Sequence, residues 1–378
     1  MQKLKKMITF STLAFSISST NANTSSSVDI NDLRIAVDLS NAVFCEEDYG
    51  DSCIKEYGFL GRSKSPEKVN VFIGNNVKSS IESNKKIIDE TPKASDLSPL
   101  MGELRKIDRS KDLKGANDSF QAFGIYDSTT NTAFVTIRGS VSILNWLMDA
   151  TIVSEQFRND PKVRVHSGFN HHLKSMLATK AVDITTGEKQ PETLQQWLDR
   201  MKLEHGDLHY VFTGLSLGAT SAVLLGATMI DQGVSPDHIK VITFGQPAVG
   251  LWGFVSKYQP LLQDNYIRVR NIGNPEKVFG SFYPATIGDP IIVSTGPFNY
   301  HHFGKELIVS EDKYHYFADT LPDWIPEQFK YLLSLHNRTN YADFICSCNP
   351  LRETCDTVTD GNMLFDLTRF KPNCKLEY

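Results

Sequence analysis

The sequence predicts an α/β protein whose mostly parallel central sheet is flanked by helices. Two observations lead to this fold class. Segments typical of strands alternate with segments typical of helices between about residues 121 and 309. In addition, the stretch 214–218 reads Gly-Leu-Ser-Leu-Gly and joins a short apolar run to a segment of helical character. A strand that turns sharply into a helix is the repeating connection of such sheets.

The amino-terminal part offers few regular elements. Apolar residues recur at helical spacing in 31–44, which predicts an amphipathic helix packed on the main domain. The following segment, from 67 to about 110, is charged and has no clear periodicity beyond a short apolar stretch at 69–73. We interpret it as a variable excursion with short helices.

Regular β structure is expected from residue 121. Runs at 121–126 and 132–138 read as strands, and Asp-Ser-Thr-Thr-Asn between them reads as a turn. A strand is expected at 163–168, followed by a helix through Met176. A long helix is predicted at 191–205.

The second half repeats the alternation. The run 208–213 is apolar enough for a buried strand, and 217–232 is a helix rich in small residues, which let it lie close to a sheet. Gly233 stands where a carboxyl-terminal cap is expected. Further strands are predicted at 239–244 and 266–270.

Composition limits the class of protein. The chain has 378 residues, of which 40% are hydrophobic and 22% charged, and its formal net charge is −5. That charge argues against a nucleic-acid partner. Three lysines precede a short apolar core at 7–17 and the small residues Thr-Asn-Ala at 20–22, which is typical of a cleaved signal peptide. The apolar core is too short to span a bilayer, so we expect a secreted protein, extracellular or periplasmic, without a transmembrane segment.

Six cysteines agree with export. Cys45 and Cys53 are close in sequence, and the other four, Cys346, Cys348, Cys355 and Cys374, form a small cysteine-rich carboxyl-terminal extension. We expect disulfides and no metal, because the spacing does not match a zinc site. The predicted organisation is a signal peptide at 1–22, a helical and variable segment at 23–115, a core domain at 116–340 and the tail at 341–378.

The Gly-Leu-Ser-Leu-Gly stretch fits the G-x-S-x-G pattern of a nucleophile elbow, with Ser216 at the tip of the turn. Glycine is needed on both sides because a Cβ would clash where strand and helix approach each other. The alternative is an ordinary β–α turn in which Ser216 only caps the helix. A serine nucleophile also needs a base and an orienting carboxylate, which in this chain order must lie beyond Ser216.

Four stretches taken together are more specific than the elbow alone. They are Phe-Val-Thr-Ile-Arg-Gly-Ser at 134–140 with Asn145-Trp146, Val-His-Ser-Gly-Phe at 165–169, the elbow at 213–218, and Thr-Phe-Gly-Gln-Pro-Ala-Val-Gly at 243–250. The combination resembles the class 3 lipases, a branch of the α/β-hydrolases that includes the fungal triacylglycerol lipases. Ala248 replaces the arginine usual in that family. The resemblance implies the α/β-hydrolase fold and a lipid ester as substrate, met at a lipid–water interface.

The resemblance also suggests site residues. His302, in His-Phe-Gly-Lys-Glu, is similar to the family's H-x-G-x-E segment, and we predict it as the base. His301 is the neighbour most easily confused with it, whereas His336 follows a helix and is interpreted as structural. For the carboxylate we choose Asp289, in Gly-Asp-Pro-Ile, with Glu276 second.

Oxyanion donors are expected at the backbone N–H of Leu217, from the elbow, and at Ser140, from the resemblance. Ser140 could also serve as a helix N-cap. The apolar segment that follows, 141–147, has the composition of a lid over an acyl-chain groove, or of an ordinary core helix.

The predicted function is hydrolysis of lipid carboxylic esters by Ser216, His302 and Asp289 through an acyl-enzyme, without a cofactor. Triacylglycerol lipase and phospholipase A1 both remain open. The family register places Asn274 where an aspartate is usual. A catalytically inactive hydrolase fold used as a secreted binding protein is therefore the alternative. A serine peptidase or acyltransferase on the same fold is a third reading.

Overall fold

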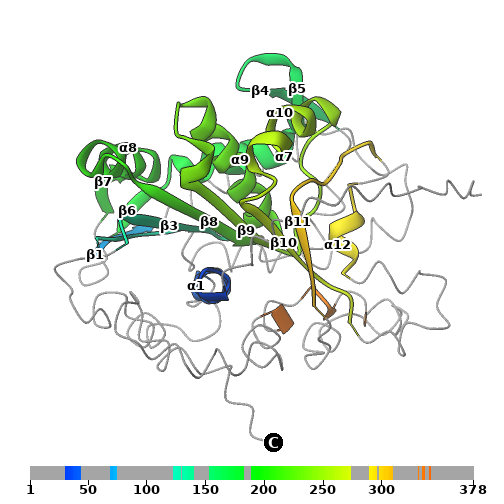
Figure 1. Ribbon diagram of the computed structural model, residues 1–378, viewed down its shortest axis with the longest axis horizontal. Helices are drawn as coiled ribbons and strands as arrows, with labels where there is room; N and C mark the ends of the chain where they lie inside the picture. The colour runs from blue at the N-terminus through cyan, green and yellow to red at the C-terminus, as the bar shows by residue number, and fades with distance from the viewer. Residues whose placement is uncertain are drawn as a thin grey trace, which may run out of the picture.

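The computed structural model describes residues 30–43, 69–74, 122–128, 130–139, 153–182, 189–273, 289–295, 298–309, 331, 334–336 and 340–341. The described strands form one nine-stranded sheet and a separate two-stranded sheet. Helices lie on both faces of the large sheet (Figure 1). The signal peptide, Ser140, the segment 141–147, Asn274, Glu276 and all six cysteines lie outside the described residues, so the predictions made for them stay predictions.

The large sheet has the strand order β11-β10-β9-β8-β3-β2-β1-β6-β7. Its strands are β1 (Val69–Gly74), β2 (Ala122–Asp127), β3 (Thr132–Ile137), β6 (Lys180–Val182), β7 (Lys189–Thr193), β8 (His209–Leu215), β9 (Ile239–Phe244), β10 (Tyr266–Asn271) and β11 (Lys305–Val309). The pairs from β3 through β8, β9 and β10 to β11 are parallel. The remaining pairs are antiparallel. The prediction of a mostly parallel central sheet flanked by helices is confirmed.

Four described helices cover one face of the sheet: α7 (Ser167–Leu177), α8 (Leu194–His205), α9 (Leu217–Asp231) and α10 (Trp252–Leu262) (Figure 1). Thirteen residues of α9 are buried, because this helix lies between the sheet and its neighbours. Gly226 shows how close it comes, since a Cβ there would stand 2.9 Å from Cγ2 of Val241 in β9. The small residues that the sequence places along this helix therefore serve close packing.

Helix α1 (Ile30–Ala42) packs on the opposite face of the sheet, beneath the central strands (Figure 1). The helix expected at 31–44 is therefore present and packs on the main domain. Its apolar stripe, including Leu33, Ala36 and Leu39, is buried. Two hydrogen bonds tie it to β8: the hydroxyls of Ser40 and Thr213 lie 3.1 Å apart, and the Thr213 hydroxyl donates to the Ala36 carbonyl at 3.3 Å.

Some expected elements differ from the structure. The strand expected at 163–168 is β5 (Asp160–His166), which pairs with β4 (Ser154–Phe157) outside the large sheet. The helix expected from Pro191 begins at Leu194, because Thr193 and Gln196 form a capping box there. The residues before it form β7 instead. Strand β1 also extends the large sheet where only a short apolar stretch had been noted.

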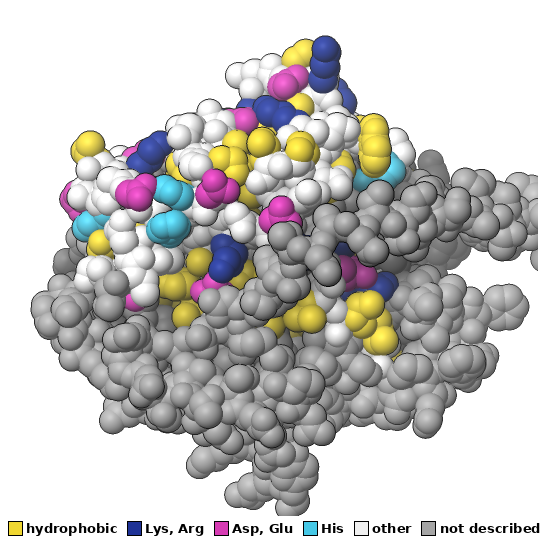
Figure 2. Space-filling view, viewed as in Figure 1, with side chains coloured by type: hydrophobic (Ala, Val, Ile, Leu, Met, Phe, Trp, Pro, Cys, Tyr) yellow, Lys and Arg dark blue, Asp and Glu magenta, His cyan; other side chains and the backbone are white. Residues whose placement is uncertain are grey.

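The described surface is mixed in charge. On the described part of the face in Figure 2, Lys and Arg side chains are interspersed with Asp and Glu. This distribution offers no broad basic area there for a polyanion. None of the helices in the described ranges combines the length and the apolar character needed to cross a bilayer.

A buried histidine should make the fold sensitive to acid. Nδ1 of His172 in α7 lies 2.7 Å from the Ser221 hydroxyl in α9. Burial, and then the positive charge of Arg138, lowers the pKa of His172 from 6.5 to about 3. The unfolded chain therefore binds this proton more readily than the folded chain. Stability is complete above pH 6.5 and falls as the pH drops toward 3.

We expect the protonation of His172 to remove about 2 kcal/mol of stability between pH 7.5 and pH 5. Urea unfolding of the wild type and of His172→Gln at both pH values measures this contribution. The variant should lose less stability on acidification, by about the same amount. Identical pH dependence in the two proteins would contradict the assignment.

Candidate active site

Ser216 stands at the turn between β8 and α9, as the G-x-S-x-G pattern predicts. Its backbone has φ 58° and ψ −122°, a conformation that residues other than glycine rarely adopt. Its N–H donates to the Phe244 carbonyl at 2.9 Å, and its carbonyl accepts from the Thr220 N–H at 3.2 Å. The side chain is 1% exposed. A strained serine fixed by backbone bonds at the end of a parallel strand is the geometry of a nucleophile elbow.

Both flanking glycines are sterically required. A Cβ on Gly218 would lie 2.0 Å from the carbonyl oxygen of Ile137, the last residue of β3. One on Gly214 would lie 2.5 Å from the carbonyl carbon of Gly218. These are backbone contacts that cannot move aside cheaply. The steric reason given from the sequence for glycine at both positions therefore agrees with the packing.

The end of β3 lies beside the serine. At Gly139 a Cβ would stand 2.5 Å from the Leu215 carbonyl oxygen and 3.5 Å from Cβ of Ser216. The chain enters residue 140 from this point. Leu217, the other predicted oxyanion donor, is the first residue of α9, where helix geometry leaves the N–H groups without intrahelical acceptors. Leu217 thus adjoins Ser216, whereas Ser140 lies outside the described residues.

Asp289 forms a buried hydrogen-bonded pair, but its partner is His336. Nδ1 of His336 lies 2.6 Å from Oδ2 of Asp289, and the two side chains are 1% and 0% exposed. Because a carboxylate only accepts, Nδ1 carries the hydrogen. In the neutral ring Nε2 is then the acceptor. Nε2 is shielded from solvent and bonds to no residue in the described part of the chain.

The carboxylate of Asp289 is held from several sides. Oδ1 accepts the Ile291 N–H at 3.0 Å, and the Asp289 N–H donates to the Asn271 carbonyl at 2.8 Å. Tyr341 donates its hydroxyl to Oδ2 at 2.6 Å. Burial, followed by the charge of Asp289, raises the pKa of Tyr341 well above its ordinary value. The phenol therefore stays protonated and keeps its role as donor.

Asn271, the last residue of β10, connects the two halves of this pair. Its carbonyl receives the Asp289 N–H, and its side-chain amide donates to the Leu335 carbonyl at 3.1 Å. Leu335 directly precedes His336. One buried asparagine thus fixes the backbone next to both the acid and the histidine, although 47 residues separate them in sequence.

Gly245 places the pair near the elbow. A Cβ on Gly245 would lie 2.6 Å from Cε1 of His336 and 2.8 Å from Oδ2 of Asp289. The residue before it, Phe244, accepts the hydrogen bond from the Ser216 N–H. The imidazole therefore packs on the backbone that directly follows the residue holding Ser216. Ser216 follows β8, His336 packs on the backbone that follows β9, and Asp289 is bonded to the last residue of β10. All three therefore lie at the carboxyl ends of neighbouring parallel strands, where ligands bind in open α/β sheets.

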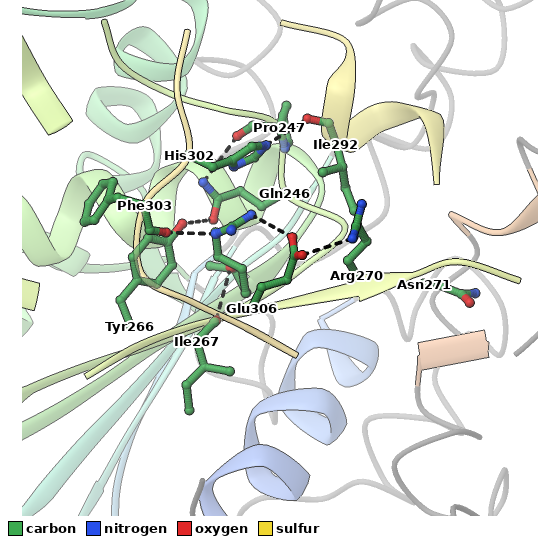
Figure 3. A network of polar contacts seen from close by, with 12 residues as sticks. Gln246, Pro247, Tyr266, Ile267, Arg270, Asn271, Ile292, His302, Phe303 and Glu306 are labelled. Carbon is green, nitrogen blue, oxygen red and sulfur yellow. Dashed lines mark hydrogen bonds and ion pairs between the residues drawn. The ribbon is translucent and has the colours of Figure 1, made fainter. Parts of the chain in front are cut away.

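His302 lies elsewhere in the structure. Its Nε2 is 2.9 Å from the carbonyl oxygen of Ile292, in the short helix α12 (Pro290–Val293) (Figure 3). Burial, followed by the positive charge of Arg268, lowers the pKa of His302 to about 3. Nε2 of His301 lies 3.0 Å from the side-chain oxygen Oδ1 of Asn299. The predicted pairing of Asp289 with His302 is thus replaced by a pairing with His336.

His336 was interpreted as structural, and Tyr341 was not predicted, for an identifiable reason. His302 follows Asp289 by only thirteen residues and stands in a family-like segment. His336 comes far later, after a segment outside the described residues. Its one sequence signal was its place directly after a predicted helix, which also suits a structural histidine. Proximity in sequence is a poor guide where loops of any length connect strand ends.

The Tyr341 hydroxyl should influence catalysis through Asp289. In Tyr341→Phe, more of the negative charge on Oδ2 faces the imidazole, and one support of the carboxylate is lost. We expect kcat for an ester to fall about tenfold and the acid limb of the pH–rate profile to move to higher pH. Tyr210→Phe is the matched control, because the buried Tyr210 hydroxyl bonds to no described residue. Equal profiles for the two variants would contradict this role.

Comparisons with known proteins agree with the elbow and its flanking strands. Residues 134–275 match the family described as lipase (class 3). A curated protein named Lipase, from Rhizomucor miehei, is 29% identical over 186 residues, which cover 48% of this chain and 42% of that protein. The chain therefore spans less than half the length of this relative.

Solved structures give similar alignments. The Lip2 lipase of Yarrowia lipolytica aligns with 15% identity and a TM-score of 0.48, over 75% of this chain and 80% of that chain. The native complex of Rhizomucor miehei lipase with its propeptide aligns with 16% identity and a TM-score of 0.47, over 84% and 80%. The segment with the family match contains β3, the elbow and β9. Residues 134–275 are thus similar to the class 3 lipases.

Proposed function

We propose that the protein is an exported serine hydrolase that cleaves carboxylic esters of lipids. One observation carries the proposal: Asp289 and His336 form a buried pair, and the imidazole of His336 packs against Gly245, beside the backbone that holds Ser216. A serine hydroxyl requires such a base, oriented by a carboxylate, to become nucleophilic. The class 3 lipase match supports a lipid ester as substrate.

In the proposed reaction, Oγ of Ser216 attacks the acyl carbonyl while Nε2 of His336 takes the hydroxyl proton. Asp289 keeps Nδ1 protonated and stabilises the imidazolium. The N–H of Leu217, together with Ser140, receives the oxyanion. The ester C–O bond then breaks, and the leaving alcohol takes the proton from His336. Water hydrolyses the acyl-enzyme by the same route, releasing the fatty acid.

His336 replaces His302 as the proposed base for two reasons. Its Nδ1 is bonded to the buried carboxylate, and its Nε2 has no described partner. The Nε2 of His302 is already engaged by the Ile292 carbonyl. The bonded acid–histidine pair also weakens the case for an inactive binding protein, which rested on Asn274 standing where an aspartate was expected.

Charge and location narrow the proposed substrate. The chain carries a net charge of −5, and removal of the proposed signal peptide would take away three further lysines. An acidic protein gains no attraction from an anionic lipid surface. We therefore favour neutral or zwitterionic lipids, triacylglycerols or phosphatidylcholine, met outside the cell or in the periplasm.

A fluorophosphonate probe and an ester series test the proposal on the exported protein. The probe should label a single peptide containing Ser216, and p-nitrophenyl esters should be hydrolysed faster than the matching anilides. Release of fatty acid from trioctanoylglycerol and from phosphatidylcholine vesicles then separates lipase from phospholipase activity. Absence of both labelling and ester hydrolysis in folded protein would favour the inactive binding protein.

A further inference from the structure

We infer that His302 is a positioning residue that holds Asp289 in place through helix α12. The inference rests on the proposed function, because it assigns Asp289 and His336 to the triad. It gives a role to a histidine that lies close to the site in sequence but is not bonded to the carboxylate. The argument depends on α12, on the hydrogen bond that His302 makes to it, and on the strand from which both are anchored.

Helix α12 is a single turn, Pro290–Val293, and Asp289 is its N-cap. Oδ1 of Asp289 accepts the Ile291 N–H, so the carboxylate is part of the first turn as well as the partner of His336. A helix of four residues has little stability of its own. Its orientation, and with it the direction of the Asp289 side chain, must be set by contacts from outside the helix.

His302 supplies such a contact at the far end of the turn. The Ile292 carbonyl can only accept, so Nε2 of His302 donates across 2.9 Å. The hydrogen is then on Nε2, and Nδ1 is bare. Nδ1 is shielded from solvent and bonds to none of the described residues. Figure 3 shows the ring directed toward Ile292.

The positive charges around His302 keep its ring neutral, so that Nε2 remains the donor to Ile292. Arg268 and Arg270 lie nearby, and both pair with Glu306, at 3.3 and 3.0 Å. Burial and these guanidinium groups hold the pKa of His302 at about 3, with His301 adding to the effect. The ring therefore stays neutral at any pH at which an ester hydrolase of this kind would operate. A histidine that does not change protonation state suits a structural bond better than proton transfer.

His302 and Asp289 are both anchored to strand β10. Next to His302, the Phe303 carbonyl accepts from Nε of Arg268 at 2.8 Å. At the other end of the strand, the Asn271 carbonyl accepts the Asp289 N–H. Helix α12 is thus held near its start by Asn271 and near its end by His302. His302 precedes β11, and β11 pairs in parallel with β10. Loss of the His302 donor therefore removes one support of α12 and loosens the turn that carries Asp289.

The test compares three variants of the full chain with the wild type. His302→Leu removes the donor. His302→Gln keeps an amide N–H at about the reach of Nε2. The matched control, His301→Leu, alters the adjacent histidine, which is turned toward Asn299 instead of α12. Each protein is assayed for kcat, KM and the pH–rate profile with p-nitrophenyl butyrate, and its thermal midpoint is measured.

For His302→Leu we expect kcat to fall about tenfold to a hundredfold, as a misplaced catalytic group would cause, with KM within about twofold because the acyl site is untouched. The acid limb of the profile should move to lower pH, because a displaced Asp289 supports the imidazolium of His336 less well. His302→Gln should recover most of kcat and the wild-type profile, and His301→Leu should match the wild type.

Wild-type kcat and an unmoved acid limb in folded His302→Leu would overturn the inference while leaving the proposed function intact. Should that variant not fold, His302→Asn, whose amide is too short to reach Ile292, replaces it in the comparison. A different result, complete inactivity of both His302→Leu and His302→Gln with retained turnover in His336→Gln, would instead make His302 the base. That outcome would overturn both the inference and the proposed triad.

Discussion

Replacing His336 with glutamine is expected to lower kcat/KM for an ester substrate by about 10⁴-fold or more. The variant keeps a polar side chain of similar length but cannot accept the proton of Ser216. Neither Asp289 nor the oxyanion donors can compensate for the loss of the base, because each contributes only when a base accepts the proton of Ser216. The measurement is hydrolysis of p-nitrophenyl butyrate, together with the rate of fluorophosphonate labelling.

The control for this prediction is the same change at the neighbouring candidate. His302→Gln should keep most of the activity, since its amide can still donate to Ile292. Thermal unfolding of both variants establishes that the comparison is made between folded proteins. Retention of more than about a tenth of wild-type turnover in His336→Gln would remove His336 from the mechanism.

Adding one methyl group at Gly218 is expected to destabilise the fold by more than about 3 kcal/mol. The new Cβ would lie 2.0 Å from the Ile137 carbonyl oxygen and 2.9 Å from the backbone at Arg138 and Gly139. These backbone atoms lie at the end of β3 and in the two residues that follow it, on one side of the proposed oxyanion site. Relief of the clash must therefore move β3 away from Ser216, so activity should be lost together with stability.

Gly226→Ala is the matched control, because it lies on the same helix. Its Cβ would meet a side-chain methyl group of Val241 at 2.9 Å, which is a longer and less rigid contact than the 2.0 Å backbone contact at Gly218. Urea unfolding should show a small change for Gly226→Ala and a large one, or no folded protein, for Gly218→Ala. Comparable stability of the two variants would show that the strand and helix at the elbow are not packed as tightly as the structure indicates.

The sequence predicted best those features that depend on local sterics and on the repeat of strands and helices. The two glycines around Ser216 are required by contacts within a few ångströms of the turn, and such a requirement is visible in the sequence itself. The small residues of α9 were informative for the same reason. The central parallel order followed from the alternation of elements, because connections between parallel strands need crossover helices.

Long-range pairing was predicted less well. Asp289 was chosen because Gly-Asp-Pro-Ile resembles a family element and lies thirteen residues before His302, but in the structure it pairs with the more distant His336. A strand was expected at 163–168, but its pairing with β4 outside the large sheet was not, because periodicity reveals a strand without revealing its neighbour. Tyr341 carries no signal at all in the sequence. A buried phenol becomes functional only through the carboxylate that the fold brings to it.

Helix α1 has a consequence for how the chain can be processed after export. Its residues seal the underside of β8, and Thr213, two positions before the end of that strand, is bonded to it. Proteolytic removal of Ile30–Ala42 would expose an apolar surface of the sheet below the turn that carries Ser216. We therefore expect a mature form of the protein to retain this helix.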